Sequence, residues 1–187
     1  SADGLHIYDQ VTASYFGVVN PVHAHGILNI STANIDDNFS AIHLWDGCNV
    51  QINSLIQGGV IHSHGGVLTV SDLSQNYVTG IYIIDGGLVI LGNPQIPAAT
   101  HDLYFANLTI NGGELRFSGG NGMSRWPSLL GGSSNLTMTG GIFRLLNHSV
   151  EIRTGNFSEN ISGGKIIVPY QFVGYPGVTS FHPTGGI

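Results

Sequence analysis

The sequence predicts an all-β chain that folds as a right-handed parallel β-helix with irregular terminal caps. Pairs of adjacent glycines recur inside a frame of alternating apolar residues, and long runs with helical periodicity are missing from the sequence. The pairs recur at nearly even intervals and begin at Gly58, Gly86, Gly112, Gly140 and Gly163. A repeat of roughly 26 residues is typical of stacked coils, in which each unit buries its apolar face against a neighbour.

The alternation within each frame predicts which side chains face the core. Tyr82 and Ile84 precede the pair Gly86-Gly87, and Val89 and Leu91 follow it with the same spacing of two. A period of two indicates strands whose apolar side chains share one face. The glycines between the two strands supply a tight corner. The frames at residues 108–117 and 136–145 repeat the same arrangement.

Stacked antiparallel hairpins are the alternative fold. The dipeptides Asp85-Gly86 and Asn111-Gly112 are common at hairpin tips. A hairpin needs about 15 residues, however, whereas a repeat of roughly 26 suits one coil with three sides. The repeat length therefore favours the β-helix.

The chain is predicted to be a single domain, 1–187, in three parts. Residues 1–40 lack a glycine pair and are expected to form an N-terminal cap, followed by β-helix repeats over 41–168. The segment 169–187 is rich in aromatic residues and proline and is expected to form a C-terminal cap. The inserts at 94–101 and 119–134 are expected to be loops.

The composition excludes several kinds of partner. Only 9% of the residues are charged, the net charge is −6, and Lys165 is the single lysine. Binding to nucleic acid or to an anionic membrane needs clustered basic side chains, so neither partner is expected. No apolar run approaches the roughly 18 residues of a membrane span, and membrane insertion is not expected either. Cys48 is the only cysteine and is interpreted as a buried thiol.

The outward positions of the predicted strands are partly apolar. Leu88 and Ile90 follow one glycine pair, and Val60 and His62 follow another. Apolar side chains on an outer face usually mark an interface. We therefore expect the chain to associate with further copies of itself.

This low-charge, glycine- and asparagine-rich solenoid resembles the β-helical receptor-binding proteins of bacteriophage tail fibres and tailspikes, over roughly residues 42–168. The resemblance implies a homotrimer on a virion, or an extracellular protein, that attaches to a host cell-surface glycan or protein. Two alternatives remain open. Some tailspikes degrade polysaccharides, and the sequence is also similar in style to secreted bacterial adhesins and passenger domains.

Two His-x-His-Gly elements are candidate metal ligands. His23 and His25 form one pair and His62 and His64 the other. Residues two apart on a strand point to the same side, so each pair can present two imidazoles to one ion. Three chains would supply six nitrogens, an octahedral set that suits a divalent transition metal. Fibres and spikes of the resembling class carry such axial iron sites, which implies a metal at a trimer axis; surface histidines are the alternative.

The sequence predicts no catalytic residue. A glycosidase needs two carboxylates about 5–10 Å apart. The corner residues that precede the glycine pairs are interpreted as polar turn residues: Gln57, Asp85, Asn111, Thr139 and Ser162. Arg116 and Arg144 occupy equivalent outward positions near Glu114, as a solvated or intersubunit pair.

A glycan-binding site is expected in the insert at 119–134. Trp126 follows Arg125 there, and an exposed aromatic ring beside a guanidinium can stack on a sugar ring. Burial of Trp126 as a plug over the solenoid is the alternative. Trp45 follows Ile42 and Leu44 in a strand pattern and is expected in the core.

Overall fold

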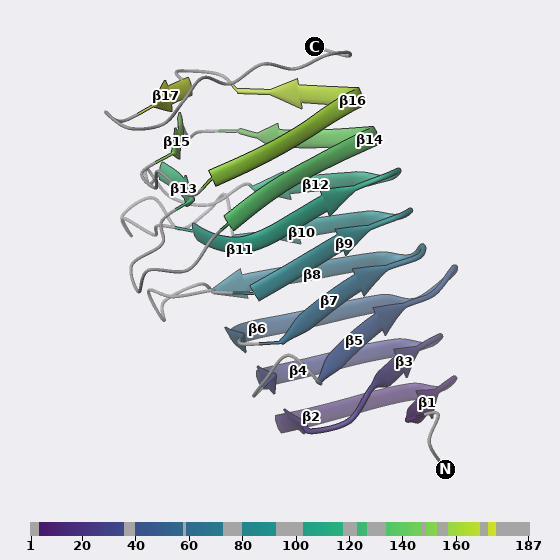
Figure 1. The fold of residues 1–187 in the computed structure, drawn as a ribbon. Coiled ribbons are helices and arrows are strands. Elements are labelled where there is room, and N and C mark those ends of the chain that lie inside the picture. Colours follow the sequence, from purple (N-terminus) through teal and green to yellow (C-terminus); the bar gives the residue numbers. More distant parts are fainter. Residues whose placement is uncertain are drawn as a thin grey trace.

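The chain climbs from its N-terminus as a parallel β-helix, each coil lying on the one before (Figure 1). In this view the nearer strands run from left to right and the more distant ones from right to left, so the winding is right-handed. This computed structural model describes residues 4–35, 40–57, 59–72, 80–92, 103–117, 123–126, 134–146, 149–152, 157–168 and 172–174. No helix occurs in that part of the chain, which confirms the predicted fold class.

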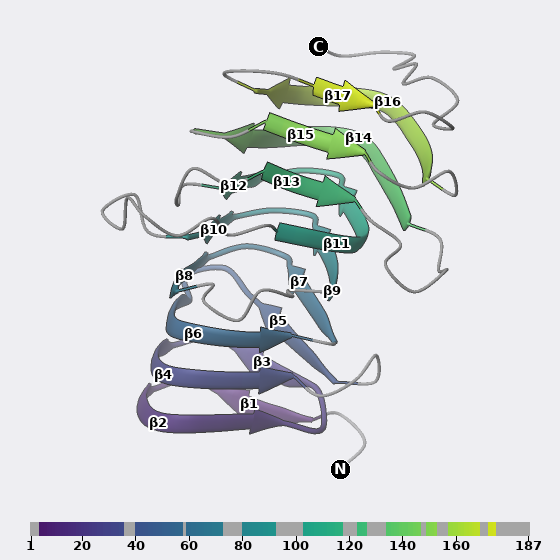
Figure 2. The same cartoon turned by 90° about the vertical axis from the view of Figure 1, so that its left-hand side faces the viewer.

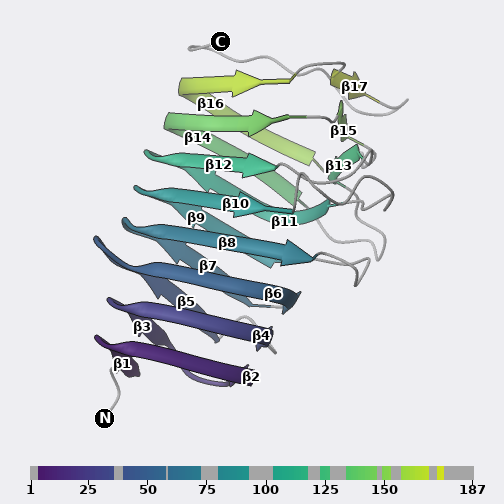
Figure 3. The ribbon, with the colours of Figure 1, turned by 180° about the vertical axis from the view of Figure 1, so that it is seen from behind.

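Three parallel sheets form the walls of the β-helix. The front sheet of Figure 1 contains β1 (Leu5–Ile7), β3 (Val22–Ala24), β5 (Ala41–Leu44), β7 (Val60–Ser63), β9 (Gly80–Ile84), β11 (Leu103–Ile110) and the first parts of β14 (Ser134–Leu145) and β16 (Phe157–Ile167). The back sheet, seen in Figure 3, contains β2 (Gln10–Val18), β4 (Ile27–Ile35), β6 (Asn49–Gln57), β8 (Val67–Asp72), β10 (Leu88–Leu91), β12 (Glu114–Phe117) and the later parts of β14 and β16. A side sheet starts on β11 and continues through β13 (Met123–Trp126), β15 (Ser149–Ile152) and β17 (Phe172–Gly174) (Figure 2).

The predicted alternation places the core correctly. Tyr82, Ile84, Val89 and Leu91 are all fully buried, and the equivalent residues of the next two frames are at most 1% exposed. The inward columns through these frames repeat apolar residues from coil to coil, since parallel pairing sets each residue on its counterpart. Complete burial of such a side chain stabilises the fold by about 1.5–3 kcal/mol.

The glycine pairs form one column of corners. Gly87 has a φ of 72°, and a Cβ atom there would lie 2.5 Å from the backbone carbon and oxygen of Gly65 in the coil below. Gly113 lies on Gly87 in the same way. Backbone therefore packs on backbone at each corner, and only a residue without a side chain fits.

The first predicted step between glycine pairs is wrong. The register aligns Val67 with Leu88, so the corner below Gly86-Gly87 is Gly65-Gly66 rather than the pair that begins at residue 58. The later steps are confirmed by the strand pairing: they run from the pair that begins at residue 86 to the pairs that begin at residues 112, 140 and 163.

Coil length varies along the axis. One column of register partners on the front sheet contains one residue from each coil. Its members are, in order, His6, His23, His43, His62, Ile83, Thr109, Thr137 and Asn160. The intervals between these positions show that every coil after His62 is longer than every coil before it. The difference arises because extra residues enter between strands without altering their register.

Regular coils extend into both segments that the sequence assigns to caps. Strands β1 to β4 pair in register within residues 5–35, well before the expected start at 41. At the other end, β17 pairs with β15 inside the segment 169–187. The insert at 119–134 was expected to be a loop, but its residues 123–126 form β13 of the side sheet. The insert at 94–101 lies outside the described residues.

None of the described segments is a helix long and apolar enough to cross a membrane.

The contact between corners predicts that replacing two glycines, both with a left-handed backbone, by alanine lowers the stability of the fold by different amounts. Gly47 has a φ of 81° but open space around its Cβ position, so Gly47→Ala is expected to cost about 1 kcal/mol from backbone strain alone. Gly87→Ala adds a backbone clash and is expected to cost about 3 kcal/mol or more. Urea denaturation of both variants measures the difference, and equal losses would contradict the corner packing.

Candidate functional site

Four doublets of ring-bearing residues end four successive strands of the front sheet. The register places His6, His23, His43 and His62 in one column. Two residues further along the chain, just past the end of each strand, lies a second ring, and these rings form a parallel column: Tyr8, His25, Trp45 and His64. We call these eight residues the imidazole ladder. Their side chains alternate with the buried residues of β1, β3, β5 and β7, so the ladder lies outside the core.

The rings of the ladder stack because the strand spacing matches the preferred separation of aromatic rings. Neighbouring strands lie about 4.7–4.9 Å apart, and aromatic pairs prefer centroid distances of about 4.5–7 Å. In the first column the centroids are 4.4 Å (His6–His23), 4.7 Å (His23–His43) and 5.3 Å (His43–His62) apart. The first two of these pairs are stacked, whereas the rings of His43 and His62 are tilted by 44° to each other. In the second column they are 4.4 Å (Tyr8–His25), 5.8 Å (His25–Trp45) and 4.2 Å (Trp45–His64) apart. The inner rings therefore present their edges to solvent, while their faces cover one another.

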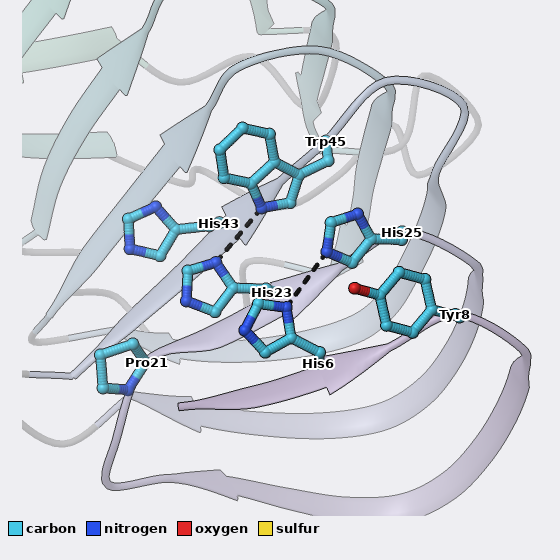
Figure 4. Close-up of a pocket in the computed structure, with 7 residues that line it drawn as sticks. All are labelled: His6, Tyr8, Pro21, His23, His25, His43 and Trp45. Carbon is cyan, nitrogen blue, oxygen red and sulfur yellow. Dashed lines mark hydrogen bonds between the residues drawn. The ribbon is translucent and has the colours of Figure 1, made fainter. Parts of the chain in front are cut away.

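Hydrogen bonds link the two columns diagonally. The indole Nε1 of Trp45 donates to His23 Nδ1 at 3.2 Å (Figure 4). His6 Nδ1 lies 3.3 Å from His25 Nε2, and His43 Nδ1 lies 3.2 Å from His64 Nε2. A bond between two imidazoles needs one N–H donor and one lone pair, so at least one ring of each pair is neutral.

The environment of the ladder favours uncharged imidazoles. Burial, followed by the charges of His23, His62 and His64, lowers the pKa of His43 to about 4. Burial is also the largest cause that lowers the pKa values of His25 and His64. At neutral pH these three imidazoles, His25, His43 and His64, are therefore neutral donors and acceptors.

An open hollow lies beside the N-terminal half of the ladder. Its volume is about 540 Å³, and seven residues line it: His6, Tyr8, Pro21, His23, His25, His43 and Trp45 (Figure 4). Tyr8 belongs to the first doublet and is 69% exposed, so its ring is accessible from solvent. The hollow combines ring surface with nitrogen edges that can donate or accept hydrogen bonds.

The other end of the ladder meets the column of polar corner residues. Asp85 Oδ2 lies 2.7 Å from His62 Nε2 and 3.9 Å from His64 Nδ1. Asn111 Nδ2 donates to Asp85 Oδ1 at 2.8 Å, and the hydroxyl of Thr139 donates to Asn111 Oδ1 at 2.8 Å. The hydrogen bond from His62 is the largest cause that lowers the pKa of Asp85. Asp85 and Asn111 lie at bends, as the turn interpretation predicted, and Asp85 also belongs to the histidine site. The turn interpretation is wrong for Thr139, Ser162 and Gln57, which lie within β14, β16 and β6.

A separate charged cluster lies on the back sheet. Glu114 Oε1 accepts from Arg116 Nε at 2.9 Å and from Arg144 Nε at 2.8 Å, as the register of β12 and β14 requires. Burial would raise the pKa of Glu114, but the hydrogen bonds and charges of the two arginines outweigh it and lower the pKa. The predicted charged rung therefore forms within one chain.

The structure brings the predicted histidines together with two that the sequence did not single out, His6 and His43. His43 lies between the two His-x-His pairs, on the strand that separates them, and contacts both pairs. The prediction that Trp45 belongs to the core is wrong. Ile42 and Leu44 point inward, and the strand alternation therefore turns Trp45 outward. The missed signal is a histidine two positions before another ring, which recurs at His6, His23, His43 and His62.

The remaining predicted residues lie elsewhere. Arg125 and Trp126 end β13 in the side sheet, where Arg125 pairs in register with Glu151 and Trp126 with Ile152. Their side chains lie outside the described part of the structure. Cys48 is 2% exposed, as expected, and burial raises the pKa of its thiol.

Comparisons of the chain with protein-family models, with curated proteins and with solved structures found no match. The fold and the ladder define the class: a right-handed parallel β-helix that carries a stacked row of imidazoles on one wall.

The lowered pKa of His43 predicts a loss of stability in mild acid. The unfolded chain takes up a proton at His43 near pH 6.5, whereas the folded chain does so only near pH 4. The contribution is complete above pH 6.5 and is lost as the pH falls to 4, with His25 and His64 acting in the same direction. We expect the melting temperature to fall by several degrees over this window.

Circular dichroism melts at pH 7, 6, 5 and 4 measure this loss. His43→Gln removes the titrating group, so its melting temperature should fall less steeply than that of the wild type. Parallel curves for the two proteins would contradict the assignment.

Proposed function

We propose that this protein is an attachment module of the phage tail-fibre or tailspike type, and that the hollow of the imidazole ladder contacts a host cell-surface glycan. The observation that carries the proposal is the hollow itself, which is open, about 540 Å³ in volume and lined by rings and polar ring edges. Sugars are neutral, rich in hydroxyl groups, and have apolar C–H faces. A site for them combines ring surface with a few fixed hydrogen-bonding groups.

The ladder supplies both kinds of contact on a rigid support. Tyr8, in the first doublet, is 69% exposed and offers ring surface. The edges of His6 and His25 beside it offer hydrogen-bond donors and acceptors. Each ring is fixed by a strand and by its stacking partners, so little side-chain freedom is lost on binding. Rigid scaffolds that present ready-made surfaces of this kind are well suited to attachment.

Two carboxylates favour binding over cleavage. A glycosidase needs one carboxylic acid whose pKa is raised, so that it is protonated when the substrate binds. The pKa values of Asp85 and Glu114 are instead lowered, by His62 and Asn111 in one case and by two arginines in the other. These two residues are therefore poor general acids.

Assembly into a homotrimer is part of the proposal. Leu88 and Ile90 of β10 point outward from the back sheet and are only half-buried, and Val67 lies beside them on β8. Three copies packed through this apolar patch would remove it from water. A trimer would also repeat the hollow three times, which strengthens attachment to a surface with many copies of one glycan.

Substitution of the exposed ring tests the glycan proposal. The wild-type protein is expected to bind a subset of bacterial surface glycans on an array. Tyr8→Ala is expected to reduce the affinity for those glycans by about tenfold or more, since ring contacts dominate such sites.

Tyr15→Ala is the matched control, because Tyr15 is 59% exposed and lies on β2, away from the ladder. It should bind as the wild type does. Equal binding by Tyr8→Ala and the wild type would exclude the hollow as the binding surface.

The trimer is tested by sedimentation velocity. The wild type is expected to sediment as a trimer and Ile90→Lys as a monomer, because a charge in the apolar patch would have to be desolvated. Thr109→Lys places the same charge on the front sheet and should leave the trimer intact. A monomeric wild type would refute this part of the proposal.

A further inference from the structure

Three imidazoles converge at the upper end of the ladder. His43 is on β5, His62 is its register partner on β7, and His64 follows two residues later. One ring nitrogen from each lies within 4.8 Å of the others. All three side chains are half-buried, so the group is accessible to an ion but partly shielded from water.

The spacing of the nitrogens is close to that of ligands on one metal ion. Zinc binds imidazole nitrogen at about 2.0–2.1 Å, which places two ligands of a tetrahedral site about 3.3–3.4 Å apart. His43 Nδ1 and His64 Nε2 are 3.2 Å apart. An ion shared by these two nitrogens would replace the hydrogen bond between them.

The surroundings hold the three rings in place. Trp45 stacks on His64 at 4.2 Å, and His23 stacks on His43 at 4.7 Å. Such packing limits ring rotation and reduces the entropy lost on binding an ion.

Asp85 supplies the carboxylate partner that metal-bound histidines usually have. It accepts from His62 Nε2 at 2.7 Å, which leaves the Nδ1 lone pair of His62 for an ion. Asn111 fixes the other oxygen of Asp85 at 2.8 Å, and Thr139 in turn fixes Asn111. This chain of hydrogen bonds extends beyond the three-histidine cluster and orients the ring of His62.

We propose that His43, His62 and His64 of a single chain bind a divalent transition-metal ion of the zinc type, with Asp85 as the positioning residue for His62. Three imidazoles leave a fourth coordination position for water or an external ligand. Imidazole favours zinc, copper, nickel and cobalt over magnesium or calcium. The site needs no second chain, which distinguishes it from a site shared by six histidines at a trimer axis.

Titration with zinc tests the site on protein without an affinity tag. In competition with a chromophoric chelator, the wild type is expected to bind one zinc ion per chain. His43→Gln and His64→Gln should each weaken zinc binding by at least about tenfold, and Asp85→Asn by about 10–100-fold. His6→Gln is the matched control, since His6 lies on the same face but outside the three-histidine group, and it should bind as the wild type does.

Circular dichroism of each variant shows whether it is folded, and cobalt absorption of the wild type gives a second readout of nitrogen coordination. The variant Ile90→Lys should keep one ion per chain whether or not it is monomeric. Failure of the wild type to bind zinc, unchanged affinity in a folded His43→Gln, or one ion per three chains would overturn the proposal.

Discussion

The spacing between parallel strands controls every other feature of this protein. Neighbouring strands lie about 4.8 Å apart, and parallel pairing in register sets each residue directly on its counterpart one coil away. Side chains and backbone atoms that stack from coil to coil must therefore all fit this one spacing. Apolar residues satisfy it inside, glycines satisfy it at the corners where backbone lies on backbone, and flat rings satisfy it on the outer wall.

The sequence predicted the strands well because their alternation is a local property. Tyr82 and Ile84 face inward whatever the length of the coil, since a period of two depends only on neighbouring residues. Register is not local. The pair that begins at residue 58 resembled a corner of this column, yet it falls between β6 and β7, whereas the corner below Gly86-Gly87 is Gly65-Gly66, between β7 and β8. Counting from one glycine pair to the next could not reveal this, because the loops lengthen without constraint from the core.

The candidate site was predicted in part for the same reason. Two histidines that are two positions apart on one strand are visible in the sequence, and so His62 and His64 were found. His43 and Asp85 join them only through pairing across coils, His43 from the coil before and Asp85 from the coil after. Asp85 is also a common residue at turns, so nothing in the sequence indicated its contact with His62. Residues from different coils that meet in the folded chain can be identified only once the pairing register of the strands is known.

The change in coil length along the axis has a further consequence. The first coil runs only from His6 to its register partner His23, whereas a later coil runs from Thr109 to Thr137 and is much longer. The side sheet begins only at β11, so the coils at the two ends of the described structure are built from different sets of strands (Figure 2). The first described coil presents β1 and β2, whereas the last presents β16 and β17. Because β17 belongs to the side sheet, which has no counterpart at the first coil, the walls of one end do not continue those of the other. A uniform solenoid would present matching open edges and would be free to polymerise into filaments. The difference between the two sets of strands restricts that growth.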